Sequence, residues 1–236
     1  MSRYRGSRSY RHEGDAYNPL RKGLALVGIL VAVTIVVGLL SSCSRSRAIK
    51  TPLAVGAGFD VSQSMSKEQK QRAVLVLDTL IDEVVLTRTP IKIWRYAETV
   101  ETVHASEPIS SDDLGRVSRD TIENYLGKWG TRPDKVMQEF QRYMKQYPDR
   151  KFVLCLFTDG ECHAKDKTRE QAAQLARNDR VVAVVIGPVI NRYRRAVENE
   201  YYAPLYDAGK LFVFSETDAL DTLARLKERL YALGNR

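Results

Sequence analysis

Residues 53–65 read Leu-Ala-Val-Gly-Ala-Gly-Phe-Asp-Val-Ser-Gln-Ser-Met, so an apolar run leads directly into the motif Asp60-Val61-Ser62-Gln63-Ser64. The run predicts a strand that ends in one carboxylate and two hydroxyls. From Pro52 onward, further apolar runs alternate with amphipathic segments. This alternation is typical of an α/β fold, and we predict a doubly wound, mostly parallel sheet with helices on both faces.

The expected elements follow from this pattern. Strands are expected at Leu53–Phe59, Ile91–Tyr96, Thr99–His104, Phe152–Phe157, Val181–Ile186 and Leu211–Phe214. Helices are expected at Lys67–Leu86, Ser111–Leu126, Pro133–Tyr147, Lys167–Asn178, Ile190–Ala208 and Asp218–Leu233. The connection 96–99 is short, which predicts a hairpin and one antiparallel edge strand.

Two later fragments supply polar groups that complement the first motif. They are Gly130-Thr131 and Thr158-Asp159-Gly160, the second of which directly follows a predicted strand. In open α/β sheets, ligands collect at the carboxyl ends of the strands. We therefore predict one metal site built from Asp60, Ser62, Ser64, Thr131 and Asp159. An all-oxygen set suits a hard divalent cation, and we expect Mg²⁺, with Mn²⁺ or Ca²⁺ as alternatives.

This arrangement resembles the von Willebrand factor type A (VWA) domain and its metal-ion-dependent adhesion site, over about residues 51–234. The resemblance implies a Rossmann-like fold in which Ser62 and Ser64 bind the metal directly. It also implies that Thr131 binds directly or through water, that the aspartates act largely through water, and that a protein partner adds an Asp or Glu carboxylate. Gln63 departs from the pattern, because this position is often glycine in the family.

The expected function is a membrane-anchored, non-catalytic, metal-dependent adhesion or assembly module. An enzyme is not expected. The three loops contain no histidine other than His163, and the sequence pairs neither serine with a base that could activate it. A magnesium-dependent phosphoryl-transfer enzyme would need a second carboxylate where Ser62 stands. A structural assembly module with an unused metal site is the other alternative.

Several local features have simpler interpretations. Asp60 or Ser62 could instead cap the helix that follows the motif. The segment 56–58, Gly-Ala-Gly, lacks the third glycine of a nucleotide-binding loop, so we expect close packing of the strand there. The run 161–163, Glu-Cys-His, is expected to form a partly exposed rim of the site rather than a transition-metal site.

Cysteine and tyrosine positions carry two more expectations. Cys155 lies in an apolar run and should be buried, whereas Cys162 follows the third loop and is expected to be exposed. Four tyrosines fall in a helical stretch broken by Pro204, and we expect them to pack in the core, with a partner-contact surface as the alternative. These are Tyr193, Tyr201, Tyr202 and Tyr206.

The amino-terminal part has a different composition. Residues 23–44 carry no charge, which predicts a membrane segment at 23–42. Six Lys and Arg precede it in 1–22 and three follow in 43–50, which favours a single-pass protein with its globular part extracytoplasmic. Leu40-Ser41-Ser42-Cys43 resembles a lipobox, so lipid anchoring through Cys43 is the alternative.

The formal net charge of +8 belongs mostly to these flanks. Residues 51–236 hold 28 Lys and Arg against 27 Asp and Glu, so no nucleic-acid partner is expected. The predicted organisation is a disordered basic tail (1–22), the membrane segment (23–42), a linker (43–51) and a VWA-like domain (52–234).

Overall fold

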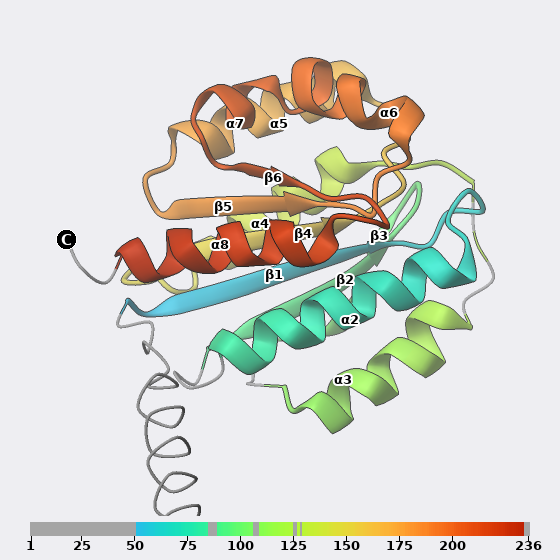
Figure 1. The fold of residues 1–236 in the computed structure, drawn as a ribbon, viewed down its shortest axis with the longest axis horizontal. Coiled ribbons are helices and arrows are strands. Elements are labelled where there is room, and N and C mark those ends of the chain that lie inside the picture. The colour runs from blue at the N-terminus through green and yellow to red at the C-terminus, as the bar shows by residue number, and fades with distance from the viewer. Residues whose placement is uncertain (1–50, 85–88, 106–108, 125–126, 128, 234–236) are drawn as a thin grey trace, which may run out of the picture. The chain divides into compact units, whose positions relative to one another are not determined.

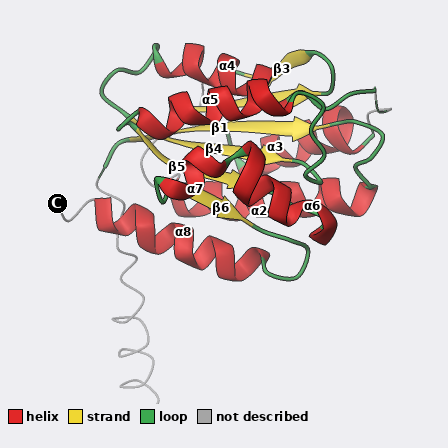
Figure 2. Cartoon of the chain, turned by 90° about the horizontal axis from the view of Figure 1, so that it is seen from above, coloured by secondary structure: helices red, strands yellow, loops and turns green. Residues whose placement is uncertain are grey.

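The computed structural model describes residues 51–84, 89–105, 109–124, 127 and 129–233, which form a six-stranded sheet between two layers of helices (Figures 1 and 2). The strands are β1 (Leu53–Asp60), β2 (Ile91–Tyr96), β3 (Val100–His104), β4 (Lys151–Phe157), β5 (Val181–Ile186) and β6 (Leu211–Val213). Their order is β3-β2-β1-β4-β5-β6, and β2–β3 is the antiparallel pair. The predicted mostly parallel sheet with an antiparallel edge is confirmed.

The helices connect these strands in the expected order. They are α2 (Lys67–Val84), α3 (Ser111–Val117), η2 (Ser118–Glu123), α4 (Pro133–Met144), α5 (Lys165–Arg177), α6 (Asn191–Ala196), η3 (Val197–Tyr201), α7 (Ala203–Asp207) and α8 (Ala219–Leu233). The predicted single helix over 190–208 is therefore wrong. Its backbone passes through the π-helical turn η3, and Pro204 lies in the first turn of α7, where its missing N–H costs no helical hydrogen bond.

The predicted single-pass membrane location is corrected. No helix in the described part of the chain is long and apolar enough to cross a membrane. The segment 23–42, on which that prediction rested, and Cys43 both lie outside the described residues. The tail 1–22 and most of the linker 43–51 lie outside them as well.

β1 is buried along its whole length, because both faces of the sheet are covered. Its odd-numbered residues from Leu53 to Phe59 pack with α2, α3 and α8. Ala54 on the other face belongs to a second core cluster, which includes residues of α4, α5 and α7. Figure 1 shows α2, α3 and α8 on one side of the sheet and α5, α6 and α7 on the other. A strand buried on both faces cannot carry charge except at its end, where Asp60 lies.

The glycines of β1 set the distance to α4. A Cβ on Gly56 would lie 2.5 Å from the Phe140 ring and 2.9 Å from the Trp94 ring. A Cβ on Gly58 would lie 2.7 Å from Val136 Cγ1. The glycines thus leave room for the first turns of α4, the helix that directly follows Thr131. The expectation of close packing at 56–58 is confirmed.

The prediction that the tyrosines pack in the core is confirmed for Tyr201 and Tyr202. Tyr201 and Tyr202 are 6 % and 2 % exposed, and both belong to the core cluster on the α4–α5 side. Tyr193 is partly buried against the same cluster. Tyr206 is 57 % exposed, so core packing was wrong for this residue.

The glycine contacts generate a stability prediction. Gly56→Ala should lower the free energy of unfolding by about 1–3 kcal/mol, because the added methyl would overlap the buried rings of Phe140 and Trp94. The matched control is Gly115→Ala in α3, where an added Cβ would meet nothing within 4 Å. That substitution should raise stability by about 0.5–1 kcal/mol. Denaturant titration of both variants measures the difference, and equal stabilities would show that α4 does not pack against β1 in this way.

Candidate metal centre

The two aspartates of the predicted site follow neighbouring strands. β1 and β4 pair in parallel, with Phe59 opposite Phe157, so Asp60 and Asp159 leave the sheet at the same edge. Asp60 is 1 % exposed and Asp159 is fully buried. Thr131 is also fully buried, Ser62 is 4 % exposed, and Ser64 is exposed.

The first loop turns tightly around the Asp60 carboxylate. The Ser62 N–H donates to Asp60 Oδ1 at 2.8 Å, and the Ser62 and Ser64 hydroxyls lie 3.0 Å apart. The helix after this loop, α2, is capped by Ser66 and Gln69, which form a capping box, and not by Asp60 or Ser62. Ser66 Oγ accepts from the Gln69 N–H (3.2 Å), and Gln69 Oε1 accepts from the Ser66 N–H (2.9 Å). The alternative in which Asp60 or Ser62 caps α2 is therefore wrong.

Thr158 connects the first and third loops and was not predicted as a site residue. Its hydroxyl donates to Asp60 Oδ2 at 3.0 Å and accepts from the Gly160 N–H at 3.3 Å. In the same third loop, the Glu161 N–H donates to Asp159 Oδ1 at 2.9 Å. Thr158 stands beside Asp159 in the sequence, but its pairing with a residue 98 positions away is a tertiary contact.

The second loop is fixed to the third by His163. The Thr131 N–H donates to His163 Nδ1 at 3.0 Å, and the His163 N–H donates to the Thr131 carbonyl at 3.1 Å. Gly130 and Gly160 have positive φ angles of 89° and 96°, which residues with a Cβ rarely adopt. Each glycine therefore allows a sharp turn directly beside a predicted ligand, Thr131 or Asp159.

Two oxygens of the predicted site lack hydrogen-bond partners. Among the described residues, six buried side-chain atoms have none, and Thr131 Oγ1 and Asp159 Oδ2 are two of them. Leaving a buried polar group unpaired costs about 1–3 kcal/mol, so such groups need an explanation. Both are hard oxygen donors, and they come from loops that follow different elements. The residues present therefore fit a divalent cation.

The electrostatics of the centre favour an added positive charge. Burial raises the pKa of Asp60 from 3.8 to about 7, hydrogen bonds from Ser62 and Thr158 oppose the rise, and the charge of Asp159 adds to it. Lys70, 6 % exposed in α2, is a second residue that the sequence analysis missed. Burial lowers the pKa of its amine, and the negative charge of Asp60 opposes that shift. A buried carboxylate with a raised pKa holds a proton that a cation can replace.

The run 161–163 differs from expectation at its centre. Cys162 is 8 % exposed rather than solvent-facing, and its Sγ lies 3.2 Å from Thr168 Oγ1. The cysteine side chain thus packs inward while Glu161 and His163 stay at the surface, with 3.9 Å between His163 Nε2 and Glu161 Oε1. The described residues contain no group of three or more His, Cys, Asp or Glu side chains arranged to hold a metal. Cys155 is fully buried, as predicted.

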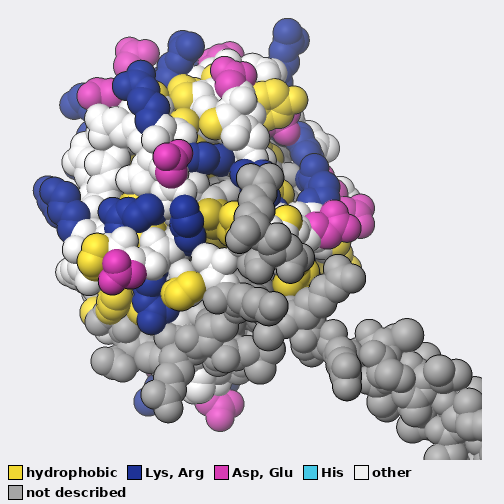
Figure 3. All heavy atoms as spheres, turned by 90° about the vertical axis from the view of Figure 1, so that its left-hand side faces the viewer, with side chains coloured by type: hydrophobic (Ala, Val, Ile, Leu, Met, Phe, Trp, Pro, Cys, Tyr) yellow, Lys and Arg dark blue, Asp and Glu magenta, His cyan; other side chains and the backbone are white. Residues whose placement is uncertain are grey.

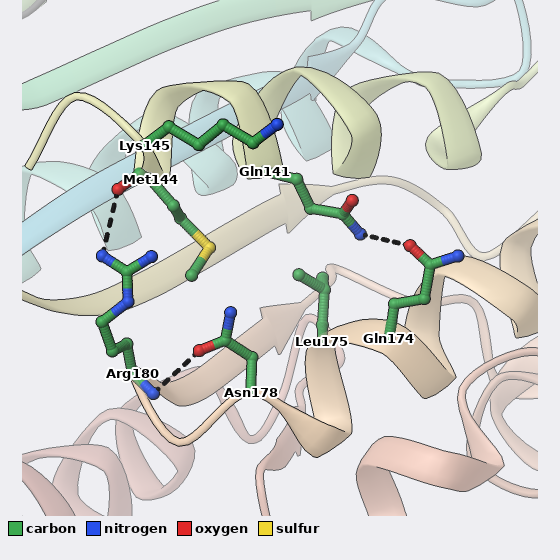
Figure 4. A pocket seen from close by; sticks show the side chains of 7 residues that line it. All are labelled: Gln141, Met144, Lys145, Gln174, Leu175, Asn178 and Arg180. Carbon is green, nitrogen blue, oxygen red and sulfur yellow. Dashed lines mark hydrogen bonds between the residues drawn. The ribbon is translucent and has the colours of Figure 1, made fainter. Parts of the chain in front are cut away.

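A groove between α4 and α5 is lined mainly by polar side chains. Figure 4 shows Gln141 pointing across it to Gln174, with 3.1 Å between Gln141 Nε2 and Gln174 Oε1. Arg180 donates to the Met144 carbonyl at the other end of the groove. Its lining residues carry no carboxylate, so this groove does not offer a cation site. On the face seen in Figure 3, where the parallel strands begin, basic and acidic side chains are interspersed among the described residues.

Comparison with known proteins identifies the fold. No protein-family model and no curated protein matches the chain. Among solved structures, it is similar to a von Willebrand factor type A structure from Catenulispora acidiphila, with a TM-score of 0.53 and 14 % identity over 77 % of this chain and 42 % of that one. The chain has a VWA-type fold.

Two further structures with the same fold carry metals. Proximal thread matrix protein 1 from the mussel byssus, with a zinc-occupied MIDAS motif, has a TM-score of 0.54 and 13 % identity over 76 % of this chain and 48 % of that one. The chain thus spans about half the length of that protein. Manganese-loaded TRAP from Plasmodium vivax has a TM-score of 0.56 and 16 % identity over 75 % and 73 % of the two chains.

The buried carboxylate generates a pH prediction. Because folding raises the pKa of Asp60, its stabilising contribution is present below the unfolded pKa and is lost as the pH rises toward 7. In chelator, the free energy of unfolding of the wild-type chain should therefore fall between about pH 4 and about pH 7 relative to Asp60→Asn, by about 2–4 kcal/mol. The asparagine retains an acceptor for the Ser62 N–H and can donate to Thr158.

Denaturant titrations of both proteins across this pH range measure the difference. The control is Asp221→Asn, which removes a carboxylate in the first turn of α8 that is not a predicted metal ligand. Its free energy of unfolding should change with pH as that of the wild type does. Parallel curves for the wild type and Asp60→Asn would contradict a buried, proton-holding Asp60.

Proposed function

We propose that this chain is a non-catalytic module that binds a protein partner through a divalent cation. The cation is held by Asp60, Ser62, Ser64, Thr131 and Asp159. The observation that carries the proposal is the pair of buried, unpartnered oxygens at Thr131 and Asp159. A polar centre of this kind needs a ligand to offset the cost of burying it.

The oxygen-only donor set favours Mg²⁺, with Mn²⁺ or Ca²⁺ as alternatives. The metals in the zinc-occupied mussel protein and in manganese-loaded TRAP support a divalent ion in this fold. When bound, the ion would supply a positive charge that attracts one further anionic oxygen. Ser64 is exposed, so the centre is open to solvent on the side of the first loop. An Asp or Glu side chain of a partner protein fits that requirement.

The surroundings of the serines support a binding role rather than catalysis. Nucleophilic catalysis by a serine needs a base within hydrogen-bond reach. His163 Nδ1 accepts the N–H of Thr131, so this nitrogen cannot serve as a base for Ser62 or Ser64. Ser62 also occupies the position where a magnesium-dependent phosphoryl-transfer enzyme would need a second carboxylate.

Thr131→Val tests the metal centre directly. Valine has nearly the same shape and lacks only the unpartnered hydroxyl, so in chelator the variant should be as stable as the wild type or about 1 kcal/mol more stable. Mg²⁺ at a concentration of about 100 times its Kd should stabilise the folded wild-type chain by about 2.7 kcal/mol. For a domain of this size, this stabilisation raises the melting temperature by about 5–10 °C. The variant should lose most of this shift.

The matched control is Thr222→Val. Thr222 is also buried, but its hydroxyl donates to the Val213 carbonyl at 3.3 Å. This variant should lose about 1 kcal/mol of stability and keep the full response to Mg²⁺. Differential scanning calorimetry with and without chelator measures both effects. An unchanged metal response in Thr131→Val, or none in the wild type, would refute the proposed centre.

Partner binding is tested by selecting randomised peptides displayed on phage against the full chain in Mg²⁺. Recovered peptides should contain Asp or Glu and should be released by chelator. Changing that acid to its amide should abolish binding, since a neutral amide oxygen is a weaker ligand for a hard cation. Peptides that bind equally well in chelator would favour the structural alternative, a module whose metal site is unused.

A further inference from the structure

Trp129 is a large apolar side chain left in solvent beside the candidate metal centre. It is 80 % exposed, the highest value among the large hydrophobic residues exposed in the described part of the chain. It stands two residues before Thr131, so the two Cα atoms are no more than about 7 Å apart. Single exposed apolar residues are common, but an exposed tryptophan next to a binding centre is typical of an interaction surface.

Gly127 and Thr131, which precede and follow Trp129 in the sequence, both contact loops of the site. A Cβ on Gly127 would lie 2.9 Å from both Gln63 N and the Val61 carbonyl, so this glycine touches the first loop. On the other side, Thr131 is fully buried and bonded to His163. Trp129 therefore lies between two points that contact the first and third loops. This places Trp129 at the rim of the candidate metal centre.

An acid that lies beside the Trp129 segment is paired with cations. It is Glu98, because a Cβ on Gly130 would lie 2.9 Å from Glu98 Oε2. Its carboxylate is paired with two cations, Arg132 at 3.1 Å and Lys135 at 3.3 Å. These ion pairs reduce the repulsion that Glu98 would exert on the carboxylate of a partner.

We propose that this rim recognises a protein segment in which an Asp or Glu lies within one or two positions of a bulky apolar side chain. This inference rests on the proposed function, because the carboxylate occupies the metal centre while the apolar side chain packs on Trp129. The metal would bind the carboxylate of any accessible Asp or Glu side chain. The tryptophan contact adds apolar burial next to it, which distinguishes one acidic segment from another.

The test extends the peptide selection with variants of the full chain. The recovered metal-dependent peptides should carry an apolar residue next to the acid. Trp129→Ala should weaken their binding at least tenfold, the size expected of a tryptophan at the centre of an interface. The matched control is Tyr206→Ala, which removes another exposed aromatic ring, from α7. It should bind as the wild type does, and Trp129→Ala should keep the wild-type response to Mg²⁺ alone.

Tryptophan fluorescence gives a second measurement. The chain contains two tryptophans, and Trp94 is fully buried. Addition of a selected peptide should shift the emission of the wild-type chain to shorter wavelength, because Trp129 leaves water. Trp129→Phe retains only Trp94, and its emission should stay unchanged.

The outcomes separate the two proposals. Acid- and metal-dependent peptides that bind Trp129→Ala at full strength would overturn the role of Trp129 and leave the metal-dependent function standing. Peptides that need neither metal nor acid, or failure to recover any metal-dependent peptide, would overturn the proposed function and this inference with it. Loss of binding in Trp129→Ala together with the fluorescence shift supports both.

Discussion

The burial of β1 on both faces is the constraint on which the rest of this structure depends. Every residue of the strand is buried, so its side chains have to be apolar or absent until the chain leaves the sheet. Glycine at positions 56 and 58 lets α4 approach the strand closely, and Thr131 lies two residues before the first residue of α4. Asp60, the last residue of the strand, consequently lies in a place that water barely reaches.

A carboxylate buried in this way has to be compensated. Thr158 and the Ser62 backbone donate hydrogen bonds to Asp60, yet its pKa remains raised to about 7 because burial dominates. Asp159 Oδ2 and Thr131 Oγ1 have no partner at all among the described residues. The proposed cation resolves both problems at once, because it offsets negative charge and binds unpaired oxygens. Destabilised polar groups in a stable scaffold are common where a protein binds a ligand.

Some parts of the fold could be predicted because they depend on local patterns. The continuous apolar runs of β4 and β5 indicate buried strands, and the short connection 96–99 indicates the antiparallel hairpin. Other expectations were wrong where several local solutions compete. Ser66 rather than Asp60 or Ser62 caps α2, and Cys162 turns inward to Thr168 although its neighbours in the sequence are polar. Capping and burial depend on neighbours that a local pattern does not include.

By itself, the sequence determined the class of fold, the strand order near the hairpin and the chemical character of the candidate site, since these depend on apolar periodicity and on which residue types follow each strand. Only the tertiary structure decided which oxygens are satisfied. The bond from Thr158 to Asp60 spans 98 positions and that from Thr131 to His163 spans 32, so neither is visible in a local pattern. Burial and hydrogen-bond satisfaction are properties of the packed chain, because each depends on atoms brought together only when the sheet forms.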